Sequence, residues 1–133
     1  MRNLFISLVI VSSAAMVSFK GNNSSLAEDK DYADCIKKYN YVWGENCPDC
    51  KSSKDSYKAF FRNECNESID LMIVVQESDK TWRKFMFTGM PPKDTMIAYA
   101  CSGTGKVKKY AKKAGDKSIT FPTIDQVNTE FKE

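Results

Sequence analysis

Two cysteines stand two residues apart in the stretch "GENCPDCK", at Cys47 and Cys50. This spacing suits thiol-disulfide redox chemistry when the first cysteine begins a helix, because the helix N-terminus lowers the pKa of the attacking thiol. The same spacing supplies half of many zinc sites. In an exported protein it can also belong to structural disulfides. The surrounding sequence indicates which of these three kinds of site the pair forms.

The chain of 133 residues contains five cysteines and no histidine. Ser-His-Asp and Cys-His nucleophile pairs and histidine-liganded zinc hydrolases are therefore excluded. A four-thiolate zinc site typically uses two Cys-x-x-Cys pairs, and only one is present. The sequence thus predicts no metal and no cofactor. It leaves a set of disulfide candidates: Cys35, Cys47, Cys50, Cys65 and Cys101.

The N-terminal region has the pattern of a signal peptide. Arg2 precedes an apolar run over residues 4–19, which is shorter than the roughly 20 residues that span a bilayer. Small residues at Ser25 and Ala27 predict cleavage after Ala27, so we expect residues 1–27 to be removed and the mature protein to have no transmembrane segment. The predicted location is exported, either secreted or periplasmic. In such an oxidising compartment we expect two disulfides and one free thiol.

The mature chain, residues 28–133, has 106 residues, which suits one domain. Within it, residues 28–57 are expected to form a helix and a cysteine-containing loop, and residues 58–133 a β-rich core of the same domain. The helix is predicted because Tyr32, Cys35, Ile36 and Tyr39 lie at i, i+3, i+4 and i+7.

Alternation of side-chain character predicts the strands. Ile69, Leu71, Ile73 and Val75 recur at the period of two that is typical of a strand with one buried face. Residues 81–89 are predicted to pair with it as a hairpin, residues 96–101 to form a further strand and residues 118–122 a last one. A short helix is expected after a Thr123 N-cap. The predicted fold is mainly β: an antiparallel sheet or small β-sandwich with a short N-terminal helix and a disulfide-tied loop.

A basic segment follows Cys101. Its apolar residues fit a helix ended by Gly115, but "SGTG" after a strand favours a hairpin, so both structures stay open. The segment could attract an anionic polymer or a membrane surface. Nucleic acid is disfavoured, because the segment lacks arginine and Tyr110 is its only aromatic residue. The candidate basic patch is Lys106, Lys108, Lys109, Lys112, Lys113 and Lys117.

Two resemblances add expectations. The segment "VWGENCPDCK" resembles the active-site segment of thioredoxin-like proteins, which implies that Cys47 attacks, Cys50 resolves the mixed disulfide, and Pro91 lies beside the pair with a cis peptide bond. The segment "FRNECNESIDLMIVV" resembles the opening strands of small secreted bacterial β-rich domains of unknown function. That second likeness implies an architecture and no activity.

These observations favour an exported, non-enzymatic binding or envelope-associated module of unknown partner, for which a protein or an envelope component is the candidate. The alternatives are a thiol-disulfide oxidoreductase using Cys47 and Cys50, and a weak binder of anionic surfaces through residues 106–117. Because Cys65 and Cys101 each end a predicted strand, we expect them to be bridged, and we expect Cys47 or Cys50 to be bridged to Cys35. Whether Asn66 in "NES" carries a glycan stays open.

We predict that the exported protein begins at Glu28. The reason is that signal peptidase admits small side chains at the third and first positions before the cut, and Ser25 and Ala27 occupy them. Intact mass of the protein recovered from the producing cells measures the N-terminus. A product that retains residues 1–19 would contradict the prediction and indicate an uncleaved anchor.

Overall fold

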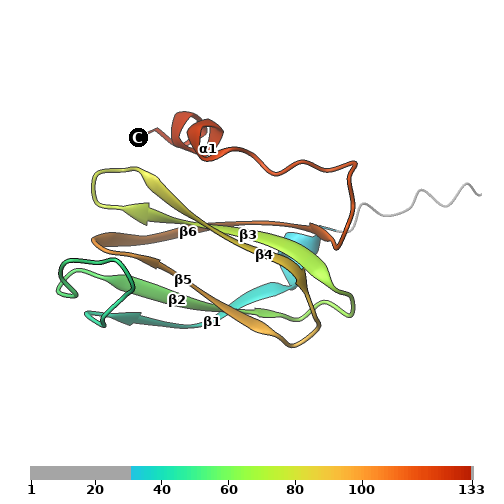
Figure 1. Cartoon of the computed structure of the whole chain (residues 1–133), viewed down its shortest axis with the longest axis horizontal. Coiled ribbons are helices and arrows are strands. Elements are labelled where there is room, and N and C mark those ends of the chain that lie inside the picture. Colours follow the sequence, from blue (N-terminus) through green and yellow to red (C-terminus); the bar gives the residue numbers. More distant parts are fainter. Residues whose placement is uncertain (1–30, 133) are drawn as a thin grey trace, which may run out of the picture.

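Six strands form two three-stranded antiparallel sheets that pack face to face (Figure 1). The structure is a computed structural model that describes residues 31–132, so the predicted signal peptide lies outside the described residues. One sheet has the order β1-β2-β5 and the other β4-β3-β6. The elements, in chain order, are η1 (Tyr32–Cys35), β1 (Ile36–Trp43), β2 (Tyr57–Asn63), β3 (Ile69–Glu77), β4 (Trp82–Met90), β5 (Thr95–Ala100), β6 (Gly103–Lys113) and α1 (Ile124–Glu130).

The predicted mainly-β fold is confirmed, and the hairpin of β3 and β4 pairs as expected, with Ile73 opposite Phe85. Strand β2 was missing from the sequence prediction. Its signal was present, because Tyr57, Ala59 and Phe61 alternate with the more polar Lys58 and Arg62, and the alternating residues are buried.

The main core lies between the two sheets. Side chains from the inner faces of β2, β3 and β5 fill it, together with Ile36 and Met90, which are both fully buried. The central members are Phe61, Leu71, Ile73, Val75 and Ala98. This packing matches the usual arrangement of a sandwich, in which inward-facing residues of two sheets interdigitate.

Strand β3 is buried on both faces, whereas the sequence predicted one buried face. Met72 and Val74 point away from the sandwich and pack with Trp82 and Val127 in a second apolar cluster. Figure 1 shows why: α1 lies over the outer side of the β4-β3-β6 sheet. The predicted Thr123 N-cap is confirmed, since its side chain accepts from the Gln126 amide and the Gln126 side chain accepts from the Thr123 amide.

The predicted N-terminal helix is wrong. Only one short 3-10 turn, η1, forms in this region, and the chain then continues as the edge strand β1. A bulge at Tyr39 explains the misleading pattern: Lys38 pairs with Phe61 and Asn40 with Phe60, so Tyr39 is an extra residue. The bulge interrupts the period of two. Only Ile36 of this strand is buried, so the strand lacked the apolar alternation by which strands are recognised.

The basic segment is a strand, β6, up to Lys113. It does not form a hairpin with β5, however, because β5 belongs to the other sheet and β6 pairs with β3. Residues 118–122 are not a strand. They lead irregularly to α1, and Phe121 packs against the outer cluster instead of joining a sheet.

We predict that Ile73→Ala lowers the free energy of unfolding by about 2–5 kcal/mol, because it leaves a cavity at the centre of a fully packed strand. Ile97→Ala is the matched control, since Ile97 is a β-strand isoleucine that is 49% exposed; its expected loss is below about 1 kcal/mol. Urea denaturation of both variants measures the difference. Equal losses would show that β3 is not the centre of the core.

Candidate functional site

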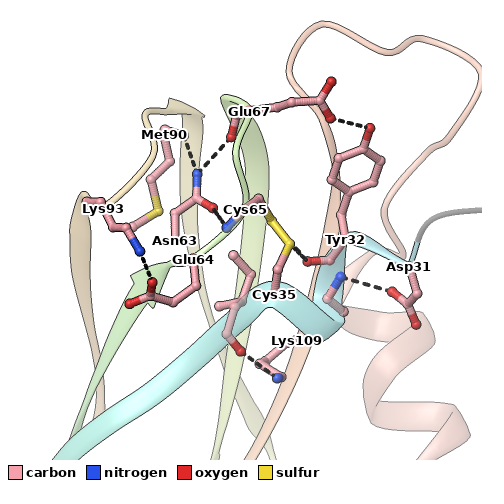
Figure 2. Close-up of a disulfide and its surroundings, with 12 residues drawn as sticks. Asp31, Tyr32, Cys35, Asn63, Glu64, Cys65, Glu67, Met90, Lys93 and Lys109 are labelled. Carbon is pink, nitrogen blue, oxygen red and sulfur yellow. Dashed lines mark hydrogen bonds and ion pairs between the residues drawn. A yellow bond between two sulfur atoms is a disulfide. The ribbon is translucent and has the colours of Figure 1, made fainter.

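The first disulfide joins Cys35, at the end of η1, to Cys65, which follows β2 (Figure 2). Buried Asn63 holds the surrounding turn: its side-chain amide donates to the Glu67 and Met90 carbonyls at 3.0 and 2.9 Å, and its side-chain oxygen accepts from the Cys65 amide at 2.8 Å. The first disulfide is therefore embedded in a fixed structural turn.

Charged and phenolic groups surround this turn on its exposed side. The hydrogen bond from Lys93 lowers the pKa of the Glu64 carboxyl, and Arg62 acts in the same direction. Tyr32 donates to the Glu67 carboxylate at 2.8 Å, and this hydrogen bond raises the pKa of the phenol. Each of these groups thus has a structural partner, as Figure 2 shows for the pairs Lys93–Glu64 and Tyr32–Glu67.

The second disulfide joins Cys50, in the loop between β1 and β2, to Cys101, at the end of β5. The Arg83 guanidinium lies 3.3 Å from the Cys101 sulfur. The Glu77 carboxylate accepts from the Cys101 and Ser102 amides at 3.1 and 2.8 Å. Residues of the β4-β3-β6 sheet thereby hold a cross-link that belongs to the opposite sheet.

The expected count of two disulfides and one free thiol is confirmed, but both predicted pairings are wrong. Cys65 and Cys101 follow the ends of β2 and β5, which run antiparallel, so the two cysteines lie at opposite ends of one sheet. A seven-residue strand separates these ends by about 20 Å, whereas a disulfide requires Cα atoms within about 7 Å. Cys35 is bridged to Cys65, not to Cys47 or Cys50.

Cys47 is the free cysteine, and its side chain is 8% exposed. Its thiol donates to the Glu45 carbonyl at 3.5 Å, and its carbonyl accepts from the Cys50 amide in a turn. This turn begins no helix, so the helix dipole that activates thioredoxin-like cysteines is missing at Cys47. The described peptide bonds, including that of Pro91, are all trans. The local likeness to thioredoxin-like proteins is therefore confined to the sequence.

The six lysines of the basic segment do not form one patch. The strand period places Lys108 and Lys112 on the outer face of the sheet and Lys109 on the inner face, where it donates to the Ile36 carbonyl at 2.8 Å. Burial lowers the pKa of Lys109, and nearby Lys37 adds to this effect. Lys112 donates to the backbone carbonyls of residues 116 and 119 at 2.7 and 2.8 Å, which fixes the chain after β6.

The remaining lysines have separate surroundings. Lys113 lies 3.7 Å from the Glu67 carboxylate, and Lys117 is exposed beyond the end of the strand. Lys106 and Lys108 line a cavity beside α1. A membrane or polymer that met one side of β6 would therefore contact only part of the predicted patch.

Strand β1 carries an aromatic surface that was not predicted from the sequence. Tyr39, Tyr41 and Trp43 are 47, 56 and 49% exposed, and we call these three residues the aromatic edge. The bulge turns Tyr39 to the outer face of the sheet, against Phe60, while Tyr41 and Trp43 pack beside Tyr57 on the other face. The signal in the sequence was the cluster "YNYVW", which was assigned to a helix and a loop.

Comparison with known proteins finds no matching family model, no matching curated protein and no matching solved structure. Between residues 31 and 132, no group of three or more cysteine and carboxylate side chains could hold a metal ion. Helix α1, with seven residues, is too short to span a membrane, and the described part of the chain contains no helix that could.

We predict that peptide mapping without reduction recovers Cys35 joined to Cys65 and Cys50 joined to Cys101. Iodoacetamide should label Cys47 only after the protein is unfolded, because that thiol is almost completely buried. The labelling step is therefore run with and without urea before the same digest. Recovery of a peptide in which Cys47 is joined to Cys50 would contradict this pairing.

Proposed function

We propose that this chain is an exported, non-enzymatic binding module that recognises an acidic protein partner through the aromatic edge. The observation that carries the proposal is the half exposure of three aromatic side chains within five residues of one edge strand. Tyrosine and tryptophan are enriched at the energetic centres of protein interfaces, because they combine a large apolar area with a polar tip.

The aromatic edge has a rigid support, which lowers the entropic cost of binding. The Trp43 ring lies 4.7 Å from the ring of buried Tyr57, and a Cβ atom at Gly105 would approach Trp43 to 3.2 Å. Tyr39 is flanked by the Arg62 guanidinium, 4.7 Å from its ring centroid. The rings are thus positioned before any partner arrives.

Charge favours an acidic partner. Strand β1 carries Lys37 and Lys38 and no acidic residue. Lys38 donates to the Tyr57 hydroxyl at 3.3 Å and lies 5.3 Å from the Tyr41 ring centroid, so its charge is held within the aromatic edge. A carboxylate on the partner would therefore meet a fixed cation beside an aromatic face.

Recognition by side chains fits this strand better than addition of a further strand. Lysines and bulges are the features that protect sheet edges from pairing with another chain, and β1 has both. The partner would then contact Tyr41 and Trp43 on one face of β1 and reach Tyr39 on the other around the sheet edge, without adding a strand to β1.

A thiol-disulfide oxidoreductase is the second candidate, favoured by the free Cys47 thiol three residues from a bridged cysteine. In that case the Cys47 thiolate would attack the Cys50 sulfur, form a Cys47–Cys50 disulfide and release the Cys101 thiolate beside Arg83. Insulin reduction by the mature protein in the presence of dithiothreitol, lost in Cys47→Ser, would favour the enzyme over the binding module.

We predict that the double variant Tyr39→Ser, Tyr41→Ser lowers partner capture about tenfold or more, since truncating two interface aromatics removes over about 1 kcal/mol each. Immobilised mature protein is incubated with the exported proteins of the producing cells, and captured proteins are quantified by mass spectrometry. Met86→Ser is the matched control, because Met86 is 49% exposed on the opposite sheet. Equal capture by all three proteins would contradict the proposal.

A further inference from the structure

A second candidate site lies away from the aromatic edge, between β6, the start of β4 and the C-terminal end of α1. It is a cavity of about 440 Å³. Figure 1 places α1 over the outer side of the β4-β3-β6 sheet, which forms the base of this region. Its lining includes Trp82, Lys106, Lys108, Glu130, Phe131 and Lys132.

Two buried hydrogen-bond donors without an acceptor lie on paired residues at this end of the sheet, and one of these residues, Trp82, lines the cavity. Trp82 and Gln76 are 5% and 0% exposed, and they pair directly across β4 and β3, so their side chains share the outer face. Within residues 31–132, neither the Trp82 indole N–H nor the Gln76 side-chain N–H group has a hydrogen-bond partner. A buried donor left without an acceptor is costly, so this pair favours a ligand that brings acceptor atoms.

Both donors are held in place by other bonds. The Gln76 side-chain oxygen accepts from the Thr104 hydroxyl at 2.9 Å, which directs its amide nitrogen elsewhere. The Trp82 backbone amide donates to the Asn128 side chain of α1 at 2.9 Å. The Trp82 ring also meets the Phe131 ring edge to face, at 6.0 Å between centroids. The bonds to Thr104 and Asn128 thus fix the Gln76 side chain and the Trp82 backbone, and the contact with Phe131 is the one that a ligand would replace.

Positive charge surrounds the same cavity. Lys108 holds its ammonium 3.4 Å from the Phe131 ring centroid and 5.9 Å from that of Trp82. Lys106, Lys132 and Glu130 also line the described part of the cavity. The Lys108 ammonium, held beside the Trp82 and Phe131 rings, favours an anion there.

We propose that this cavity binds a small anion that carries a carboxylate or phosphate group. The oxygens of that group accept from the Trp82 indole N–H and are neutralised by Lys108, both of which line the cavity. The indole N–H is buried at present, so the Phe131 ring, which follows the last turn of α1, rotates aside to admit the group.

Nuclear magnetic resonance can test this directly, because the chain contains two tryptophans and Trp43 serves as an internal control. The mature ¹⁵N-labelled protein is titrated separately with sodium phosphate and sodium benzoate, each against sodium chloride at equal ionic strength. We expect the Trp82 indole N–H resonance to shift downfield and saturate, while the Trp43 resonance stays unchanged. Saturation by phosphate alone identifies a phosphate ligand, and saturation by benzoate alone identifies an aromatic carboxylate.

Charge variants complete the test. Lys108→Gln should raise the dissociation constant about tenfold, and Lys132→Gln, at an exposed position near the chain end, should raise it in the same direction. Lys117→Gln is the matched control, since Lys117 belongs to the same basic segment but does not line the cavity. No saturable Trp82 shift with either anion, or equal weakening by Lys117→Gln, would overturn the proposal. The aromatic edge would be unaffected by that outcome.

Discussion

Strand β3 has no exposed face along residues 69–76, and the arrangement of every neighbouring element follows from that burial. Its backbone pairs with β4 on one side and β6 on the other, so the strand needs two partners. Its inner side chains require a second sheet, and its outer side chains require the chain after β6. Because each large apolar side chain contributes about 1.5–3 kcal/mol when buried, leaving either face open would remove a large part of the stabilisation.

The two layers that cover β3 differ in character. The layer between the sheets is apolar and is tied at both ends of the β1-β2-β5 sheet by disulfides. The outer layer depends on a seven-residue helix, which would be only marginally stable as an isolated peptide. The three buried polar groups without partners in the described chain, on Gln76, Trp82 and Tyr110, all lie in this outer layer. Burial also raises the pKa of Tyr110. The molecule therefore combines a fixed sandwich with a more adaptable covering.

Features that depend on a few neighbouring residues could be predicted from the sequence. The alternation from Ile69 to Val75 and the Thr123 cap are of this kind. Strand β1 could not be predicted, because an edge strand needs little apolar alternation and its bulge breaks what remains. The cysteine pairing depends on which strand ends share one end of a sheet. The cavity beside α1 joins Trp82 to Lys132, which are far apart in the chain, and no local pattern records that contact.

The order of the cross-links has a consequence for the integrity of the chain. Cys35 pairs with Cys65 and Cys50 with Cys101, so the two disulfides interleave along the chain. Cys50 lies between Cys35 and Cys65, and Cys65 lies between Cys50 and Cys101. Hydrolysis of any single peptide bond between Cys35 and Cys101 leaves the two pieces joined by at least one disulfide. Sequential pairing of neighbouring cysteines would instead have left an unprotected stretch between two loops. A molecule cut once in this region therefore stays covalently whole, and only the segments outside these cysteines can be released by one cut.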